Sequence, residues 1–180
     1  MGDGGGGSVV RLAGPPHQAV VSRPASGKHH TVPPPSSSLL NSSNMSKIVG
    51  KYKMESSDNF DEFMKALGVG LVMRKMGNAA TPTVEITLED GVYILKTITT
   101  FKTTEIKFKL GEEFQETTAD GRTVKSTITL DGNKMIHNQL GDKEKEEKDS
   151  VLVREFTDTE MLMECKVDDV VCKRVYKRQE

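Results

Sequence analysis

The sequence of 180 residues has no tryptophan, only two cysteines, and almost no excess of charge of either sign. Two cysteines are too few for a disulfide scaffold and suit a reducing compartment. A net charge of −1 argues against a general nucleic-acid-binding protein, because such proteins usually carry a basic excess. No apolar run approaches the roughly 20 residues that span a bilayer as a helix. The composition predicts one soluble domain with additional disordered sequence.

Residues 1–44 differ in composition from the rest of the chain. They contain GDGGGG, PPP and SSSLLNSSN, with few large apolar residues and no hydrophobic periodicity. Such a segment buries too little surface to offset its ordering entropy, so we predict a disordered leader over 1–44 and a folded domain over 45–180. VVRLAG and AVVS are too short for the apolar core of a secretory signal, and Met45 is a candidate alternative start.

Two short helices are expected after a first strand at Gly50–Met54. Asn59 and Glu62 have the spacing of a capping box at the start of the first helix. An apolar stripe at helical spacing follows, and a second one ends at Gly77-Asn78. The stripes comprise Phe60, Phe63, Met64 and Leu67, then Val69, Val72, Met73 and Met76. Core packing is sufficient to explain both.

Beyond Pro82 the pattern is that of strands alone. Turn pairs recur at intervals close to ten residues, at Asp90-Gly91, Leu110-Gly111, Asp120-Gly121 and Asp131-Gly132. We count about ten strands, and antiparallel hairpins in that number need closure or stacking to remove their edges. The sequence therefore predicts a mainly β fold, a ten-stranded antiparallel up-and-down β-barrel, with the helix pair as a lid between strands 1 and 2.

The last strands of the chain carry the sharpest functional signal. If Asp158-Thr159 and Asp168-Asp169 are two-residue hairpin loops, Arg154 faces Met163 and Met163 faces Arg174. Both arginines then share a largely apolar face that should turn inward. Arginine is almost never fully buried without a partner, and that face holds no Asp or Glu. A ligand with a carboxylate head would supply the partner.

A second interpretation of these strands stays open. Neither turn contains glycine, and a slip of one residue would send both arginines to solvent. The same register places Cys165 opposite Cys172, where packing is the expected role of both, although a cross-strand disulfide could form under oxidation.

Little in the sequence points to an enzyme. Three of the four histidines lie in the leader, and no nucleophile–base pair or cluster of metal ligands is apparent. The histidines are His17, His29, His30 and His137. We expect no catalytic activity, no metal and no cofactor.

Several segments resemble the intracellular fatty-acid-binding proteins, with a likeness to the heart, adipocyte and myelin group or to an arthropod muscle counterpart. They are GKYKM, NFDEFMKALGVG, TTFKTTEIKFKLGEEFQETTADGRTVKS, TLDG and LVRE, and the likeness covers essentially all of 45–180. The resemblance implies a ten-stranded β-clam with a helix-turn-helix cap over an internal cavity. It also implies non-enzymatic binding of long-chain fatty acids, a monomer, and a cytoplasmic location.

The resemblance also assigns a carboxylate site. The family's two arginines and one tyrosine match Arg154 in LVRE and Arg174 and Tyr176 in CKRVY. It implies that Arg154 reaches the carboxylate through water and that Arg174 and Tyr176 reach it directly. It further implies a set of cavity or portal residues: Phe60, Met64, Phe101, Lys102, Asp120, Met163 and Cys165.

A small basic group of Lys65, Arg74 and Lys75 lies on the helix pair. In relatives such groups attract anionic membranes or act in nuclear import, whereas simple solubility is the alternative; transient membrane contact is the functional role we expect. Two alternatives to a fatty-acid carrier remain. One is a retinoic-acid carrier of the same fold, since those relatives also use two arginines and a tyrosine. The other is a membrane-surface interaction module.

Overall fold

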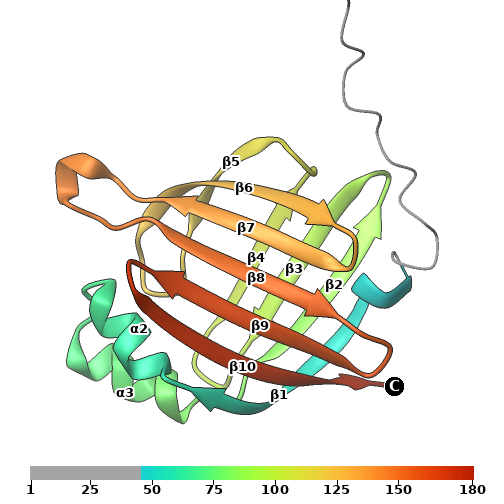
Figure 1. The fold of residues 1–180 in the computed structure, drawn as a ribbon, viewed down its shortest axis with the longest axis horizontal. Helices are drawn as coiled ribbons and strands as arrows, with labels where there is room; N and C mark the ends of the chain where they lie inside the picture. The colour runs from blue at the N-terminus through green and yellow to red at the C-terminus, as the bar shows by residue number, and fades with distance from the viewer. Residues whose placement is uncertain (1–45) are drawn as a thin grey trace, which may run out of the picture. The chain divides into compact units, whose positions relative to one another are not determined.

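A computed structural model describes residues 46–180 (Figure 1); the predicted leader and its boundary lie outside the described residues. The elements in chain order are β1 (Gly50–Asp58), α2 (Phe60–Ala66), α3 (Leu71–Ala79), β2 (Thr83–Glu89), β3 (Val92–Ile98), β4 (Thr103–Phe108), β5 (Glu113–Thr117), β6 (Thr123–Asp131), β7 (Lys134–Leu140), the 3₁₀ helix η1 (Lys143–Lys145), β8 (Ser150–Phe156), β9 (Glu160–Val167) and β10 (Val170–Gln179). No helix of this part of the chain is long and apolar enough to cross a membrane.

The ten strands form one antiparallel sheet that curls into a nearly closed barrel (Figure 1). Except for β4 and β5, neighbours in sequence are neighbours in the sheet, and β1 joins β10 to complete the order β4-β3-β2-β1-β10-β9-β8-β7-β6-β5. Helices α2 and α3 connect β1 to β2 and lie at one end of the strands. The predicted fold class, strand number and position of the helix pair are confirmed.

Strands β4 and β5 are the two ends of this sheet order, and within residues 46–180 no strand pairing joins them. Aromatic side chains cross between them instead. Phe108 of β4 stacks on Phe114 of β5 with ring centroids 5.8 Å apart, and Phe108 also stacks on Tyr93 of β3 at 5.5 Å. We call this junction the β4–β5 seam; side-chain packing holds it where a backbone ladder holds every other junction.

The register of the last three strands is the one that the sequence predicts. Arg154 pairs with Met163, and Met163 pairs with Arg174. The second hairpin turns without glycine because Asp168 adopts a left-handed conformation, with φ 49°, which aspartate tolerates better than most residues. The open question of a one-residue slip is thereby settled, and both arginines lie on the inner face.

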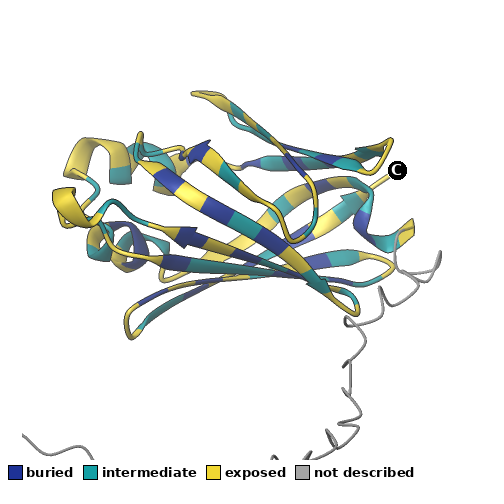
Figure 2. Ribbon diagram, turned by 90° about the horizontal axis from the view of Figure 1, so that it is seen from above, coloured by how far each residue is buried: buried dark blue, intermediate teal, exposed yellow. Residues whose placement is uncertain are grey.

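Alternate residues of the strands are buried, as the banding in Figure 2 shows. The larger core cluster fills the end of the barrel away from the helices and includes Tyr52, Phe156 and Met161. A smaller cluster joins Phe63 and Met64 of α2 to residues of β9 and β10.

Two details of the helix pair differ from the sequence prediction. Asn59 is the N-cap residue of α2, but its side chain makes no capping bond. Its Nδ2 donates to the carbonyl of Val171 at 2.8 Å and so ties the helix to β10. Helix α3 does not end at Gly77-Asn78 and continues to Ala79. Gly77 is an interior residue where a Cβ would lie 2.8 Å from Met64 Sδ, so close helix packing is its role.

Arg178 joins the two ends of the described chain. Its guanidinium donates to the carbonyls of Ser46, Lys47 and Val49 at 2.8–3.0 Å and to the Tyr52 hydroxyl at 2.9 Å. These bonds hold the segment before β1 against the last strand.

We expect Arg178→Gln to lower the free energy of unfolding by about 2–3 kcal/mol, because several charge-assisted bonds to partly buried carbonyls are lost together. Urea denaturation measures the change. Lys173→Gln, at an exposed position of the same strand, is the control and should leave stability unchanged. Equal stability of the two variants would contradict the role given to Arg178.

Candidate functional site

The barrel encloses a cavity of about 420 Å³ beneath the helix pair. Strands from both halves of the sheet and both helices contribute to its wall. Its apolar lining comes mainly from α2, α3 and the last strands, and includes Phe63, Leu67, Val69, Met73, Met76, Ala80 and Leu152. A smaller polar set comes from β5 to β8 and includes Glu116, Thr118, Gln139 and Arg154. The cavity therefore suits an amphiphile with a long apolar part and a polar head.

The two predicted arginines border this cavity and are buried, with 5% of Arg154 and 8% of Arg174 exposed. Arg154 Nε and Nη1 and Arg174 Nε have no hydrogen-bond partner among the described residues. Burial lowers the pKa of Arg154 below its usual value, yet a guanidinium stays protonated in proteins. An anionic head group in the cavity would give these buried, charged donors their hydrogen-bond partners.

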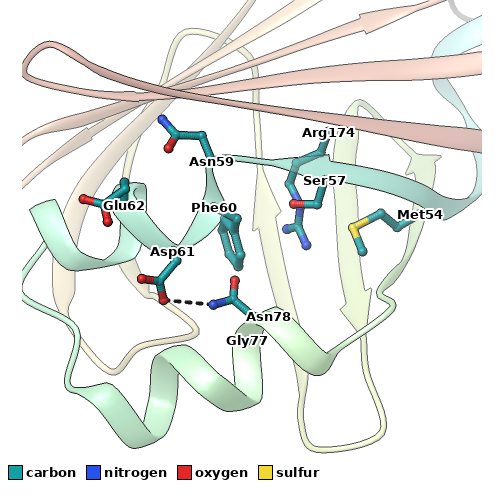
Figure 3. A pocket seen from close by; sticks show the side chains of 9 residues that line it. All are labelled: Met54, Ser57, Asn59, Phe60, Asp61, Glu62, Gly77, Asn78 and Arg174. Atoms are coloured by element: carbon teal, nitrogen blue, oxygen red, sulfur yellow. Dashed lines mark hydrogen bonds between the residues drawn. The ribbon is translucent and has the colours of Figure 1, made fainter.

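Helix α2 positions Arg174 by aromatic stacking. The Arg174 Cζ lies 4.0 Å from the centroid of the Phe60 ring, a cation–π contact. Figure 3 shows the two side chains together in a second hollow of about 350 Å³ that Met54, Ser57 and Asn78 also line. Asn78 of α3 donates to Asp61 of α2 at 2.9 Å beside them. Arg174 thus lines both the barrel cavity and this second hollow beside the helix pair.

Tyr176 is buried one inward position along β10 from Arg174. Its ring centroid is 5.9 Å from Arg174 Cζ. Burial raises the pKa of the phenol, against the opposing effect of the Arg174 charge, so the hydroxyl stays protonated and can donate. Tyr176 itself is not among the described residues that line the cavity surface.

All seven residues that the resemblance assigned to the cavity or portal line this cavity: Phe60, Met64, Phe101, Lys102, Asp120, Met163 and Cys165. Phe101 is 55% exposed on the β3–β4 turn, and Lys102 donates to the carbonyl of Ala119 in the β5–β6 turn at 3.1 Å. Cys165 faces Cys172 across β9 and β10, and both are free thiols buried in the wall.

Asp120 lines the cavity wall, and its negative charge is neutralised by Arg122. Arg122 Nε donates to Asp120 Oδ2 at 2.7 Å, and the Thr118 hydroxyl donates to the other carboxylate oxygen at 2.5 Å. Sequence analysis named Asp120 and missed Arg122, although both line the cavity.

A buried carboxylate at Glu116 is the main feature that sequence analysis missed. One oxygen, Oε2, accepts from Ser126 at 2.6 Å, from His137 Nε2 at 2.9 Å and from Gln139 Nε2 at 3.1 Å. The Ser150 hydroxyl donates to the side-chain Oε1 of Gln139 at 2.8 Å. The alternation of EFQETT places Phe114, Glu116 and Thr118 on one face. This pattern was the one indication in the sequence that Glu116 points inward.

The ionisation of this network follows from burial and hydrogen bonding. Burial alone would raise the pKa of Glu116, but the bonds from His137, Ser126 and Gln139 outweigh it and lower the pKa to about 2. Burial lowers the pKa of His137, so its ring is neutral and donates from Nε2. The pair is therefore a carboxylate and a neutral imidazole at neutral pH.

The three residues of the basic group on the helices differ in exposure and in contacts. Lys65 and Lys75 are exposed. Arg74 is engaged within the helix pair, with Nε 3.2 Å from Asp61 Oδ1 and Nη1 3.0 Å from the carbonyl of Val69.

The chain is similar to known proteins in sequence and in fold. Residues 49–179 match the lipocalin / cytosolic fatty-acid binding protein family. The chain is 56% identical over 131 residues to the sodium/calcium exchanger regulatory protein 1 of Doryteuthis pealeii, a match that covers 73% of this chain and 96% of the relative. It is 47% identical over 131 residues to the muscle fatty acid-binding protein of Schistocerca gregaria, covering 72% and 94%.

The fold agrees with a solved structure of a ligand-bound relative. The Schistosoma mansoni fatty acid binding protein in complex with arachidonic acid superposes with a TM-score of 0.72 and 39% identity, over 75% of this chain and 99% of that one.

Glu116 should give the protein a characteristic acid sensitivity. Its folded pKa of about 2 lies below the ordinary 4.5, so its contribution, about 3 kcal/mol, is present above pH 4.5 and is lost as pH falls toward 2. His137 adds to the loss below pH 6.5, because the unfolded state takes up its proton more readily. Urea denaturation from pH 7 to pH 3 should therefore show a flatter profile for Glu116→Gln than for wild type.

Glu113→Gln, an exposed position on the same strand, is the control and should keep the wild-type profile. Parallel profiles for wild type and Glu116→Gln would show that Glu116 has no depressed pKa.

Proposed function

The chain belongs to the lipocalin / cytosolic fatty-acid binding protein family, and we propose that it carries long-chain fatty acids inside the barrel. The family and the relatives are binding proteins, so the chain is not an enzyme. The observation that carries the proposal is the pair of buried arginines with unpartnered nitrogen atoms on the wall of a largely apolar cavity.

Arg154, Arg174 and Tyr176 hold the carboxylate in this proposal. Arg174 and the Tyr176 hydroxyl contact the head group directly, and Arg154 reaches it through water. A planar guanidinium fixes the position of a carboxylate more firmly than a lysine ammonium does. The phenol adds a donor without adding a charge that must be desolvated. Stacking on Phe60 limits where the Arg174 guanidinium can lie.

The alkyl chain supplies most of the affinity. Each buried methylene contributes roughly 0.8 kcal/mol, so a 16-carbon chain offers on the order of 12 kcal/mol before immobilisation costs are subtracted. Phe60, Met64, Phe101, Met163 and Cys165 give the chain its apolar contacts or its entrance, with Lys102 and Asp120 at the polar rim. The arginines supply orientation and the choice of head group.

A retinoic-acid carrier is the second candidate, since the same arginines and phenol would hold that carboxylate. We propose fatty acid as the ligand because two of the relatives described above, those of Schistocerca gregaria and Schistosoma mansoni, are named as fatty acid-binding proteins. The protein acts as a monomer in the cytoplasm in this proposal; nuclear entry is the alternative location.

Wild-type protein purified from its source should carry bound 16–20-carbon fatty acid in native mass spectrometry, and Arg174→Gln should carry at least tenfold less. The loss follows because the variant no longer offers the direct charged donor to the head group. Lys173→Gln, whose side chain is exposed, is the matched control and should keep its ligand.

An empty wild-type barrel that also refuses added oleate would contradict the carrier proposal. Retinoic acid in the same titration would then test the second candidate.

The helix pair is the surface we propose for transient contact with anionic membranes. Leu71, Val72 and Met73 of α3 are 57%, 74% and 44% exposed, next to the exposed Lys75. Apolar side chains beside a lysine suit a shallow contact with anionic lipid. If contact with membranes were instead the main role, this surface would be the membrane-interaction module.

Lys75→Glu should slow fatty-acid transfer to anionic vesicles several-fold while leaving the affinity for fatty acid unchanged. Transfer of a fluorescent fatty acid to phosphatidylserine vesicles measures the rate. Arg74 is unsuitable for this test because its reversal would also break the contact with Asp61. An unchanged rate would exclude this surface as the docking face.

A further inference from the structure

The charges of the side chains that line the cavity do not sum to zero. Asp120 and Arg122 form an ion pair of 2.7 Å, and Lys102 is exposed at the rim. The remaining charged groups of the wall are Glu116, Arg154 and Arg174. Among residues 46–180 neither of these two arginines forms a salt bridge, so the interior carries one negative and two positive charges beyond the Asp120–Arg122 pair.

Glu116 is held firmly in place within this wall. Its Oε2 accepts three hydrogen bonds from side chains of β6 and β7, and the bond of Ser150 to Gln139 extends the network to β8. Glu116 is buried, with 8% of the residue exposed, so its carboxylate does not turn to solvent. A fixed negative charge at this place acts on anything that enters the cavity.

Arg154 is the cation that Glu116 offsets. The two share the cavity wall, and His137, which bonds to Glu116, lies one inward position from Arg154 on the neighbouring strand, since Arg154 pairs with Met135 of β7. Burial lowers the pKa of Arg154, and the charge of Glu116 opposes that lowering. Burial also lowers the pKa of His137, and the charge of Arg154 lowers it further. The interior is thereby left with one uncompensated positive charge, at Arg174.

We propose that Glu116 is a specificity-determining residue that restricts the cavity to ligands whose head group carries a single negative charge. This rests on the proposed function and adds a selection by ligand charge. A monocarboxylate brings the buried charge to zero. A dianionic head would leave one negative charge without a partner in a low-dielectric interior, and an unpaired buried charge is strongly unfavourable.

The test compares two amphiphiles of equal chain length, palmitate and hexadecyl phosphate, by calorimetric titration at pH 8. A phosphate monoester is dianionic at this pH, whereas palmitate is a monoanion. Wild type should prefer palmitate. In Glu116→Gln the ratio of the two affinities should shift at least tenfold toward hexadecyl phosphate, because the interior then holds two uncompensated positive charges. The ratio is taken within one variant, so a general loss of affinity cancels.

Two further variants separate charge from the loss of hydrogen bonds. The double variant Glu116→Gln/Arg154→Gln restores the wild-type sum of charges and should return the ratio toward the wild-type value. Arg154→Gln alone should shift the ratio of affinities the other way, toward palmitate. This variant tests the inference if Glu116→Gln fails to fold. Glu113→Gln, exposed on the same strand, should behave as wild type.

An unchanged ratio in folded Glu116→Gln, or a double variant that keeps the ratio of Glu116→Gln, would overturn the inference while leaving the carrier proposal intact. A wild-type protein that binds neither amphiphile would overturn both.

Discussion

Burial of two guanidinium groups on the inner face of β8 and β10 is the constraint on which the rest of the structure depends. A buried arginine needs compensation, and the surrounding elements provide part of it. Phe60 of α2 lies against Arg174, and Glu116 of β5, three strands from β8 in the sheet order, lines the same cavity as Arg154. The arrangement holds only while the two hairpins keep their register, since one residue of slip would exchange the inner and outer faces.

The sequence was sufficient for that register because hairpin pairing is local. Once Asp158-Thr159 and Asp168-Asp169 are taken as turns, every pair of β8, β9 and β10 follows, and the structure has those pairs. Strand number and barrel topology were predictable for the same reason, from Asp-Gly and Leu-Gly pairs at regular spacing. The arginines and their neighbours Met163 and Cys165 on β9 could therefore be located before any coordinates. The other cavity residues followed from the resemblance to the family, and the roles of all of them in holding a ligand remain proposals.

The features that sequence analysis missed depend on contacts between distant residues. Glu116 is bonded by residues 10, 21 and 23 positions away, and in the sequence it is one acidic residue of an alternating strand. Asn59 has the spacing of a capping box, but its amide bonds to Val171, 112 positions away. Gly77 suggests a helix end, yet packing against Met64 explains it. Local propensity could not anticipate these choices, because tertiary contacts decided each of them.

The β4–β5 seam has a consequence for how the protein can accommodate a bulky ligand. Elsewhere around the barrel, widening would have to break backbone hydrogen bonds between strands. At the seam, ring contacts such as Phe108 on Phe114 must slide and the exposed bond from Lys102 to Ala119 must yield, but within residues 46–180 no ladder between strands has to break. The wall can therefore widen at the seam, where one set of dispersion contacts replaces another. The free-energy cost of that exchange is small. The barrel therefore widens more easily at the β4–β5 seam than at any junction held by a strand ladder. A thicker ligand is accommodated by separation of β4 and β5 rather than by even expansion of the whole barrel.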